Sequence, residues 1–335
     1  MRTEDLTLKQ KILQMFIVGF NGQNYIFNRN FTELLKQGLG GVIFFTHNIS
    51  NEKQFRELIS NLSKDAPVPM FFSIDQEGGR VERTEKIHNG KKYLSAKQAF
   101  EMGISYLQNQ TKEIALELKS YGINMNFAPV LDVNTTEENP IIGERAFSNN
   151  VEEVTNASKV VIREYEKYGI ISVGKHFPGH GAATADSHKT LPVINLPKDE
   201  IENIHIRPFK EAINIGLNAI MAAHVLYPQL DSENPASVSK KIINDILIND
   251  IGFDGLIITD DMEMNGIKGL SKIDACIKAI NAGISMFIFR DTTKETLELI
   301  TDIENAINKG LISEDKINAT VNKIFNIKEK YAILR

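Results

Sequence analysis

Short apolar runs recur along the chain, and amphipathic stretches separate them. Most of these runs are continuously apolar, which is typical of strands in a parallel sheet buried on both faces. The predicted strands span residues 15–19, 41–45, 69–75, 124–130, 171–176, 219–224, 255–260 and 284–290. The predicted helices between them span residues 52–62, 96–120, 151–168, 198–215, 240–249 and 272–282. Eight strands that alternate with helices predict a closed (β/α)₈ barrel of the α/β class.

Two more helical patterns follow the last predicted strand, at residues 294–308 and 313–328, and would complete the outer ring. No Pro/Ser-rich linker divides the chain, so we expect one domain over residues 1–335. The alternative is an open doubly wound sheet. That fold would place a glycine-rich phosphate turn after the first strand, and residues 19–23 do not supply one.

The amino-acid composition limits which kinds of molecule this chain is expected to bind. The formal net charge is −5, which does not indicate a positively charged surface, so we do not expect nucleic acid binding. No apolar run approaches the roughly 20 residues that span a bilayer, and the N-terminus shows no secretion signal. We therefore expect a cytoplasmic, monomeric protein that does not bind membranes. Cys276 is the only cysteine, which excludes an internal disulfide and a cysteine-based zinc site.

Unusual polar residues end four of the predicted strands. They are Asp75, the pair Lys175 and His176, His224, and the pair Asp260 and Asp261. In a (β/α)₈ barrel the carboxyl ends of the strands converge on one face, where active sites are built. A single polar residue at a strand end could be a helix cap, but four together indicate a functional constellation.

The loop after the fifth predicted strand contains two histidines, His176 and His180, with the four-residue spacing of a helical zinc pair. Pro178 and Gly179 fall between them and preclude a regular helix. No Glu follows the first histidine, so the metalloprotease motif is absent. A metal site of another kind is the weaker alternative.

Asp186 and His188 lie two residues apart further along this loop. A carboxylate that accepts a hydrogen bond from the Nδ1–H of a histidine fixes its tautomer, which leaves Nε2 free for proton transfer. The alternative is that Asp186 forms an Asx turn and His188 is solvated. The residues alone do not decide between the two.

Asp260 follows the apolar run 255–259 and would emerge at the barrel mouth, where it could attack a sugar carbon. A retaining glycosidase needs one such nucleophile and one acid/base. Asp261 has a structural alternative as the N-cap of a following helix.

Four segments, at residues 75–83, 143–147, 175–188 and 259–264, resemble glycoside hydrolase family 3. The resemblance covers most of the chain and is specific to the short, single-domain β-N-acetylglucosaminidases that recycle bacterial cell-wall fragments. It implies that Asp260 is the nucleophile, that His188 is the acid/base and that Asp186 is its partner.

The resemblance also implies a sugar-binding set, and it leaves His180 and His224 in support roles. It implies a covalent glycosyl-enzyme, no metal and no cofactor. The substrates it implies are β-linked N-acetylglucosamine saccharides, in particular muropeptide fragments. The residues that match the sugar-binding positions are Asp75, Arg83, Arg145, Lys175 and His176.

Family members that act as β-glucosidases carry a second domain that supplies the acid/base. This sequence ends at Arg335, so we expect its acid/base to come from the barrel. Three rival functions stay open: phosphorolysis of the same substrates, a non-catalytic saccharide-binding barrel, and a metal-dependent hydrolase that uses His176, His180 and Asp260.

Overall fold

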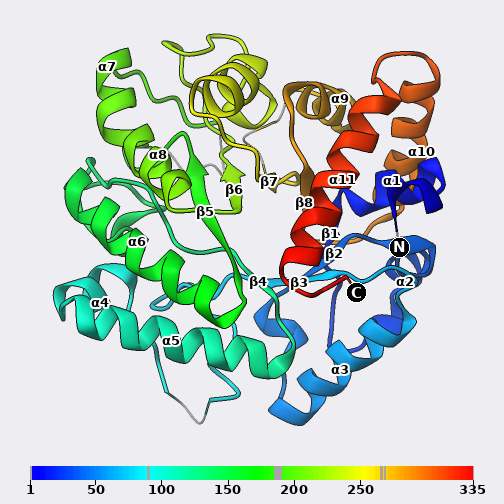
Figure 1. Ribbon diagram of the computed structural model, residues 1–335, viewed down its shortest axis with the longest axis horizontal. Coiled ribbons are helices and arrows are strands. Elements are labelled where there is room, and N and C mark those ends of the chain that lie inside the picture. The colour runs from blue at the N-terminus through cyan, green and yellow to red at the C-terminus, as the bar shows by residue number, and fades with distance from the viewer. Residues whose placement is uncertain (1, 89–90, 185–190, 265–266, 268, 335) are drawn as a thin grey trace.

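A computed structural model describes residues 2–88, 91–184, 191–264, 267 and 269–334. Eight parallel strands form a closed barrel in sequence order, and each strand pairs with the next until β8 pairs with β1. Figure 1 shows this barrel with helices around it. The prediction of a (β/α)₈ barrel is confirmed. The strands are β1 (Phe16–Val18), β2 (Gly41–Phe44), β3 (Phe71–Ile74), β4 (Met125–Asn126), β5 (Ile171–Phe177), β6 (Ala219–Ala222), β7 (Leu256–Asp261) and β8 (Met286–Phe289).

The outer ring consists of helices that follow the predicted amphipathic stretches, and it includes two N-terminal helices that the sequence analysis did not predict. Wider π-type helical turns occupy Ile201–Ile206 and Lys241–Asp250. The α-helices are α1 (Leu8–Gln14), α2 (Arg29–Gly38), α3 (Glu52–Asp65), α4 (Ala96–Glu101), α5 (Ile104–Tyr121), α6 (Val151–Tyr168), α7 (Lys198–Glu200), α8 (Arg207–Asn214), α9 (Lys272–Ala282), α10 (Lys294–Asn308) and α11 (Glu314–Lys330).

Local sequence explains where these helices begin and end. The side chain of Asn150 accepts hydrogen bonds from the first-turn amides of α6, and Gly169 ends that helix with a left-handed φ of 71°. The prediction of one continuous helix over 96–120 is wrong, because Gly103 adopts a φ of 100° between α4 and α5. A positive φ is incompatible with a helical turn and is accessible to glycine at little cost.

The core lies inside the barrel and between the barrel and its helices. Strands β1 to β6 and β8 are buried along their whole length, as continuously apolar runs predict. On neighbouring strands, the rings of Phe16 and Phe289 stack with centroids 5.6 Å apart. Full burial of one such side chain stabilises the fold by about 1.5–3 kcal/mol, so these rings rigidify the barrel that carries the site.

Two strands are irregular where they reach the mouth of the barrel. In β5, the pairing with β6 skips His176 between Lys175 and Phe177. In β7, the pairing with β8 advances by three residues between Ile258 and Asp261 while β8 advances by two. An extra residue in one strand of a pair bends that strand and re-aims its side chains, and such bulges are frequent beside active sites.

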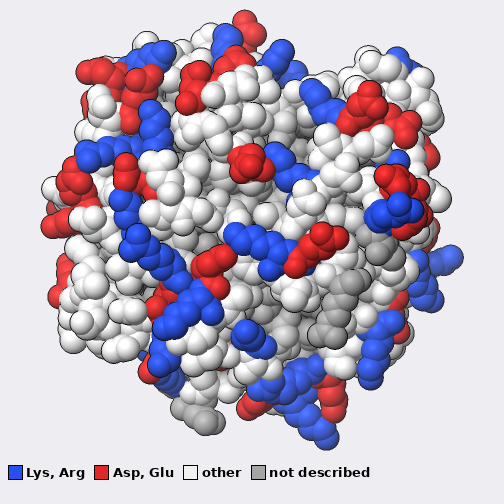
Figure 2. All heavy atoms as spheres, viewed as in Figure 1, with Lys and Arg blue, Asp and Glu red and all other residues white. Residues whose placement is uncertain are grey.

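Lys and Arg side chains are interspersed with Asp and Glu over the face seen in Figure 2. Among the described residues, no helix combines the length and the apolar character that a membrane crossing requires.

Candidate active site

A cavity of about 390 Å³ opens where the strands end. Six of the sequence-predicted site residues line it together: Asp75, Arg83, Arg145, Lys175, His176 and Asp260. Asp186 and His188, the other two members of the predicted set, lie outside the described residues. The converging strand ends of the barrel therefore bring together residues that are up to 185 positions apart in the sequence, from Asp75 to Asp260.

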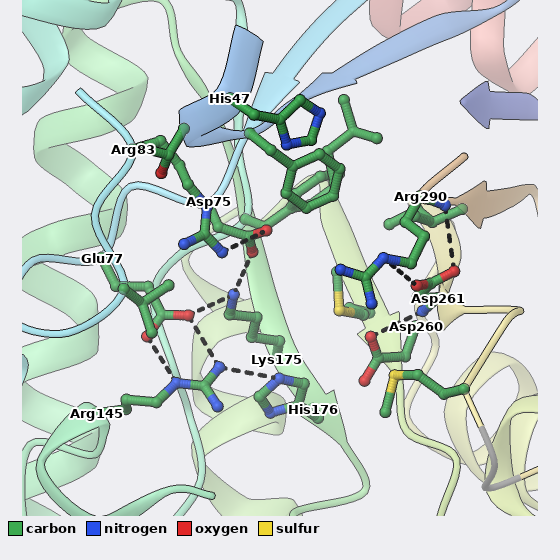
Figure 3. Close-up of a pocket in the computed structure, with 18 residues that line it drawn as sticks. His47, Asp75, Glu77, Arg83, Arg145, Lys175, His176, Asp260, Asp261 and Arg290 are labelled. Atoms are coloured by element: carbon green, nitrogen blue, oxygen red, sulfur yellow. Dashed lines mark hydrogen bonds and ion pairs between the residues drawn. The ribbon is translucent and has the colours of Figure 1, made fainter. Parts of the chain in front are cut away.

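One side of the cavity is a network of matched charges, which Figure 3 shows around Glu77. The Lys175 Nζ atom lies 2.9 Å from Asp75 Oδ1 and 2.6 Å from Glu77 Oε1. Arg145 meets both carboxylate oxygens of Glu77, through Nε and Nη2, at 2.9 Å each. This two-point contact fixes the guanidinium plane as well as its position.

The environment keeps the Glu77–Arg145 pair charged. Burial alone would raise the pKa of Glu77, but attraction by Arg145 and Lys175 outweighs it and holds that pKa well below its usual range. Although burial of the guanidinium lowers the pKa of Arg145, the Glu77 carboxylate raises it above its usual value. The Glu77–Arg145 pair, together with Asp75 and Lys175, thus presents several donors and acceptors to the cavity, as recognition of sugar hydroxyls requires.

His176 is oriented from behind by Asp132, a fully buried carboxylate that follows β4. Asp132 Oδ2 lies 2.7 Å from His176 Nδ1, while Oδ1 accepts the backbone N–H of His176 at 3.2 Å and that of His180 at 2.6 Å. Nδ1 is thereby the donor to Asp132, and Nε2 faces the cavity, 3.4 Å from Arg145 Nη2.

Asp260 lies across the cavity from Glu77 and Arg145 (Figure 3). Its Oδ1 atom accepts the backbone N–H of Asp261 at 2.8 Å. Desolvation alone would raise the pKa of Asp260, but the electrostatic effects of His176 and His224, the Asp261 amide and Lys175 together lower it below its usual value. Because its pKa is lowered, Asp260 is ionised at neutral pH. Its side chain is also partly exposed, and it lines the cavity.

The pKa of Asp261, its neighbour, is shifted in the opposite direction. Burial and the adjacent Asp260 charge raise the pKa of Asp261 to about 6. Its side chain accepts the backbone N–H of Glu263 at 3.1 Å and that of Arg290 at 3.3 Å, so it braces a turn and the end of β8. The N-cap alternative correctly expected this carboxylate to accept backbone amides, but these amides belong to a turn and to Arg290, the residue after β8.

The sequence analysis missed several residues that line or support the cavity. Glu77 lay within the quoted segment 75–83 but was not singled out. Asp132 and Arg290 both stand at or just beyond predicted strands, so the strand-end argument applied to Asp75 could have found them. Phe45 also ends a predicted strand, and the guanidinium groups of Arg83 and Arg290 lie 5.8 and 6.0 Å from the centroid of its ring.

His180 lies beneath this site, with its ring centroid 5.9 Å from that of His176. Burial, with His176 next to it, lowers the pKa of His180 to about 4, so its ring is neutral at neutral pH. Across residues 2–88, 91–184, 191–264, 267 and 269–334, no group of three or more His, Cys, Asp or Glu side chains is arranged to hold a metal ion.

Comparison with known proteins places this site in a family. Residues 7–327 match the family described as "Glycosyl hydrolase family 3 N terminal domain". The chain belongs to glycosyl hydrolase family 3. Within this family, a beta-hexosaminidase from Nitrosomonas eutropha is 32% identical over 314 residues, which are 89% of this chain and 87% of that protein.

Two longer relatives contain a region equivalent to this chain. The structure of a beta-N-acetylglucosaminidase from Paenibacillus sp. str. FPU-7 superimposes with a TM-score of 0.93 at 32% identity, over 98% of this chain and 63% of that one. Beta-hexosaminidase A of Pseudoalteromonas piscicida is 32% identical over 87% of this chain. This chain spans about half, 53%, of that relative's length.

Proposed function

We propose that this family 3 protein is a retaining exo-β-N-acetylglucosaminidase that removes the non-reducing-end N-acetylglucosamine from cell-wall fragments. The observation that carries the proposal is the ionised Asp260, which shares one cavity with the matched charges of Asp75, Glu77, Lys175 and Arg145. A carboxylate at a strand end and a polar set for hydroxyls are the two components that glycoside cleavage needs on the sugar side. The names of the relatives support the choice of N-acetylglucosamine.

In the proposed first step, Asp260 attacks the anomeric carbon of the sugar. A bond forms between an Asp260 oxygen and that carbon, the glycosidic C–O bond breaks, and His188 transfers its proton to the departing oxygen. Asp186 orients His188. Asp75, Arg83, Arg145, Lys175 and His176 hold the sugar by its hydroxyls.

In the second step, water attacks the same carbon from the face that the leaving group vacated. His188 takes a proton from this water, the Asp260–sugar bond breaks, and the sugar leaves with its configuration retained. The reaction as proposed uses no metal or cofactor. We extend the proposal to one barrel domain that acts as a monomer in the cytoplasm, the setting that recycling of cell-wall fragments implies.

A mechanism-based sugar tests the nucleophile directly. A 5-fluoro N-acetylglucosaminyl fluoride should inactivate the enzyme by forming a slowly hydrolysed glycosyl-enzyme, and peptide mapping should find the label on Asp260. A label on any other residue contradicts the assignment. Product analysis in phosphate buffer should find free N-acetylglucosamine; accumulation of the sugar 1-phosphate would instead indicate phosphorolysis.

A further inference from the structure

The backbone around Asp260 lacks regular strand pairing on both sides. Towards β6, the ladder ends at the pair Ala222 and Thr259. Towards β8, the register shift between Ile258 and Asp261 places Asp260 within the irregular stretch. Backbone groups at such a bulge leave the regular ladder, so the orientation of the strand end must be set by other contacts.

The imidazole of His224 supplies one of these contacts. It lies just beyond the end of β6, is 1% exposed, and its Nε2 atom is 3.1 Å from the backbone oxygen of Asp261. The carbonyl oxygen can only accept, so Nε2 donates the hydrogen. The side chain of His224 thereby continues the β6–β7 contact two residues beyond the last backbone pair.

Ser237 holds the other side of the ring. Its Oγ lies 2.6 Å from His224 Nδ1, and burial lowers the pKa of His224, so the ring is neutral and Nδ1 accepts the hydroxyl hydrogen. The backbone N–H of Ser237 donates to Ala223 O at 3.0 Å, which ties the serine to the segment that carries the histidine. The contacts of Ser237 therefore fix the His224 tautomer that carries its hydrogen on Nε2.

We propose that His224 is a positioning residue that holds the Asp261 carbonyl and so orients the Asp260 carboxylate towards the sugar. This inference rests on the proposed function. The linkage is short, because the backbone N–H of the same Asp261 donates to Asp260 Oδ1 at 2.8 Å. A rotation of this residue's peptide units would move the carboxylate with them. His224 is not among the residues that line the cavity, so it acts through β7 and not on the substrate.

The test is a set of substitutions at this position. His224→Phe keeps a planar ring but leaves the Asp261 carbonyl unpaired, and should lower kcat by about 10- to 100-fold with KM close to the wild-type value. His224→Gln can place an amide donor near the position of Nε2 and should recover most of the lost kcat, whereas His224→Asn, which is shorter, should not. Ser237→Ala should cost less, about 3- to 10-fold in kcat, because Nε2 can still donate.

Controls separate positioning from stability. Leu299→Ala, a buried change in the outer helix α10, should lower the melting temperature but leave kcat per folded enzyme unchanged. The rate of Asp260 labelling by the 5-fluoro sugar should fall in parallel with kcat for each His224 variant.

Two results would overturn the inference on His224. One is wild-type kcat in folded His224→Phe while Asp260→Asn is inactive, a result that leaves the proposed function standing. If His224→Phe does not fold, equal kcat values for the Gln and Asn variants would overturn it instead. Activity in Asp260→Asn would contradict the proposed function itself.

Discussion

The two sides of the cavity hold their charges in different ways. On the side of β3 and β5, Lys175 bridges Asp75 and Glu77, and Arg145 pairs with Glu77 through two bonds. On the side of β7, no described cationic side chain forms an ion pair with Asp260, and its direct hydrogen bond is to a backbone amide. Matched charges suit the binding of a neutral sugar, whereas a carboxylate that accepts a backbone amide retains further lone pairs for a covalent bond.

This difference predicts that substitutions on the β7 side act mainly on kcat and those on the β3–β5 side mainly on binding and stability. The largest effect should come from Asp260→Asn, which removes the charge of the proposed nucleophile but keeps the shape of its side chain. We expect kcat for an aryl β-N-acetylglucosaminide to fall on the order of 10⁴-fold or more, with KM changed little. Near wild-type turnover in a steady-state assay would remove Asp260 from the nucleophile role.

His188→Ala should have the next largest effect, and its size should depend on the leaving group. Loss of a general acid costs about 10²–10⁴-fold when the departing oxygen needs a proton. Substrates with acidic phenol leaving groups need less help and should lose less rate. The measurement is kcat/KM across a series of aryl substrates; an equal loss across the series would show that His188 is not the acid.

Glu77→Gln should break the matched network while leaving Asp260 untouched. Arg145 would lose its carboxylate partner in a site where its side chain is only 12% exposed, so we expect a loss of about 3–5 kcal/mol in the free energy of unfolding and a raised KM. Glu298→Gln is the matched control, because it breaks the exposed Lys294–Glu298 pair and should cost less than about 1 kcal/mol. Denaturant unfolding and kinetics of both variants test the contrast, and equal stability losses would contradict it.

The smallest effect concerns Asp261, whose folded-state pKa is raised to about 6 from a usual value of 3.8. Its folded form binds the proton more tightly than the unfolded chain, so its contribution to stability is present at low pH and is lost as pH rises from about 4 to 6. Relative to wild type, Asp261→Asn should gain up to about 2–3 kcal/mol of stability across this window. Urea unfolding of both proteins at pH 4.5 and 6.5 measures this gain. A stability difference that does not change with pH would contradict the raised pKa.

The fold was predictable because the same sequence pattern, an apolar run that marks a buried strand, recurs along the chain. Each strand must be apolar on both faces to lie between the barrel interior and a helix, and this makes a run that is visible in the sequence. The limits of single elements were less predictable. Residues 124–130 predicted a strand, yet β4 retains only Met125 and Asn126 in the ladder. The continuous pattern over 96–120 concealed the break that Gly103 introduces.

The site residues were predictable where a polar side chain ends an otherwise apolar run. Asp75, Lys175 and Asp260 each end an apolar run, and the topology of a barrel then implies that they meet. Glu77 carries no comparable signal, and the position of Asp132 and Arg290 at or just beyond predicted strands does not show which residues they contact. Their importance follows from their partners, which lie between 29 and 98 positions away in sequence, as Arg290 does from Asp261 and Glu77 from Lys175.

The sequence by itself determined the barrel, the face on which the polar strand ends gather, and the chemical types of side chain available there. Only the tertiary structure decided in which direction the pKa of each carboxyl group shifts. Asp260 and Asp261 are chemically identical neighbours, yet His176, the Asp261 amide and Lys175 help to lower the pKa of one against desolvation, and burial beside that charge raises the pKa of the other. The reason is physical: a pKa depends on desolvation and on charges within a few ångströms, and in a barrel those charges come from other strands.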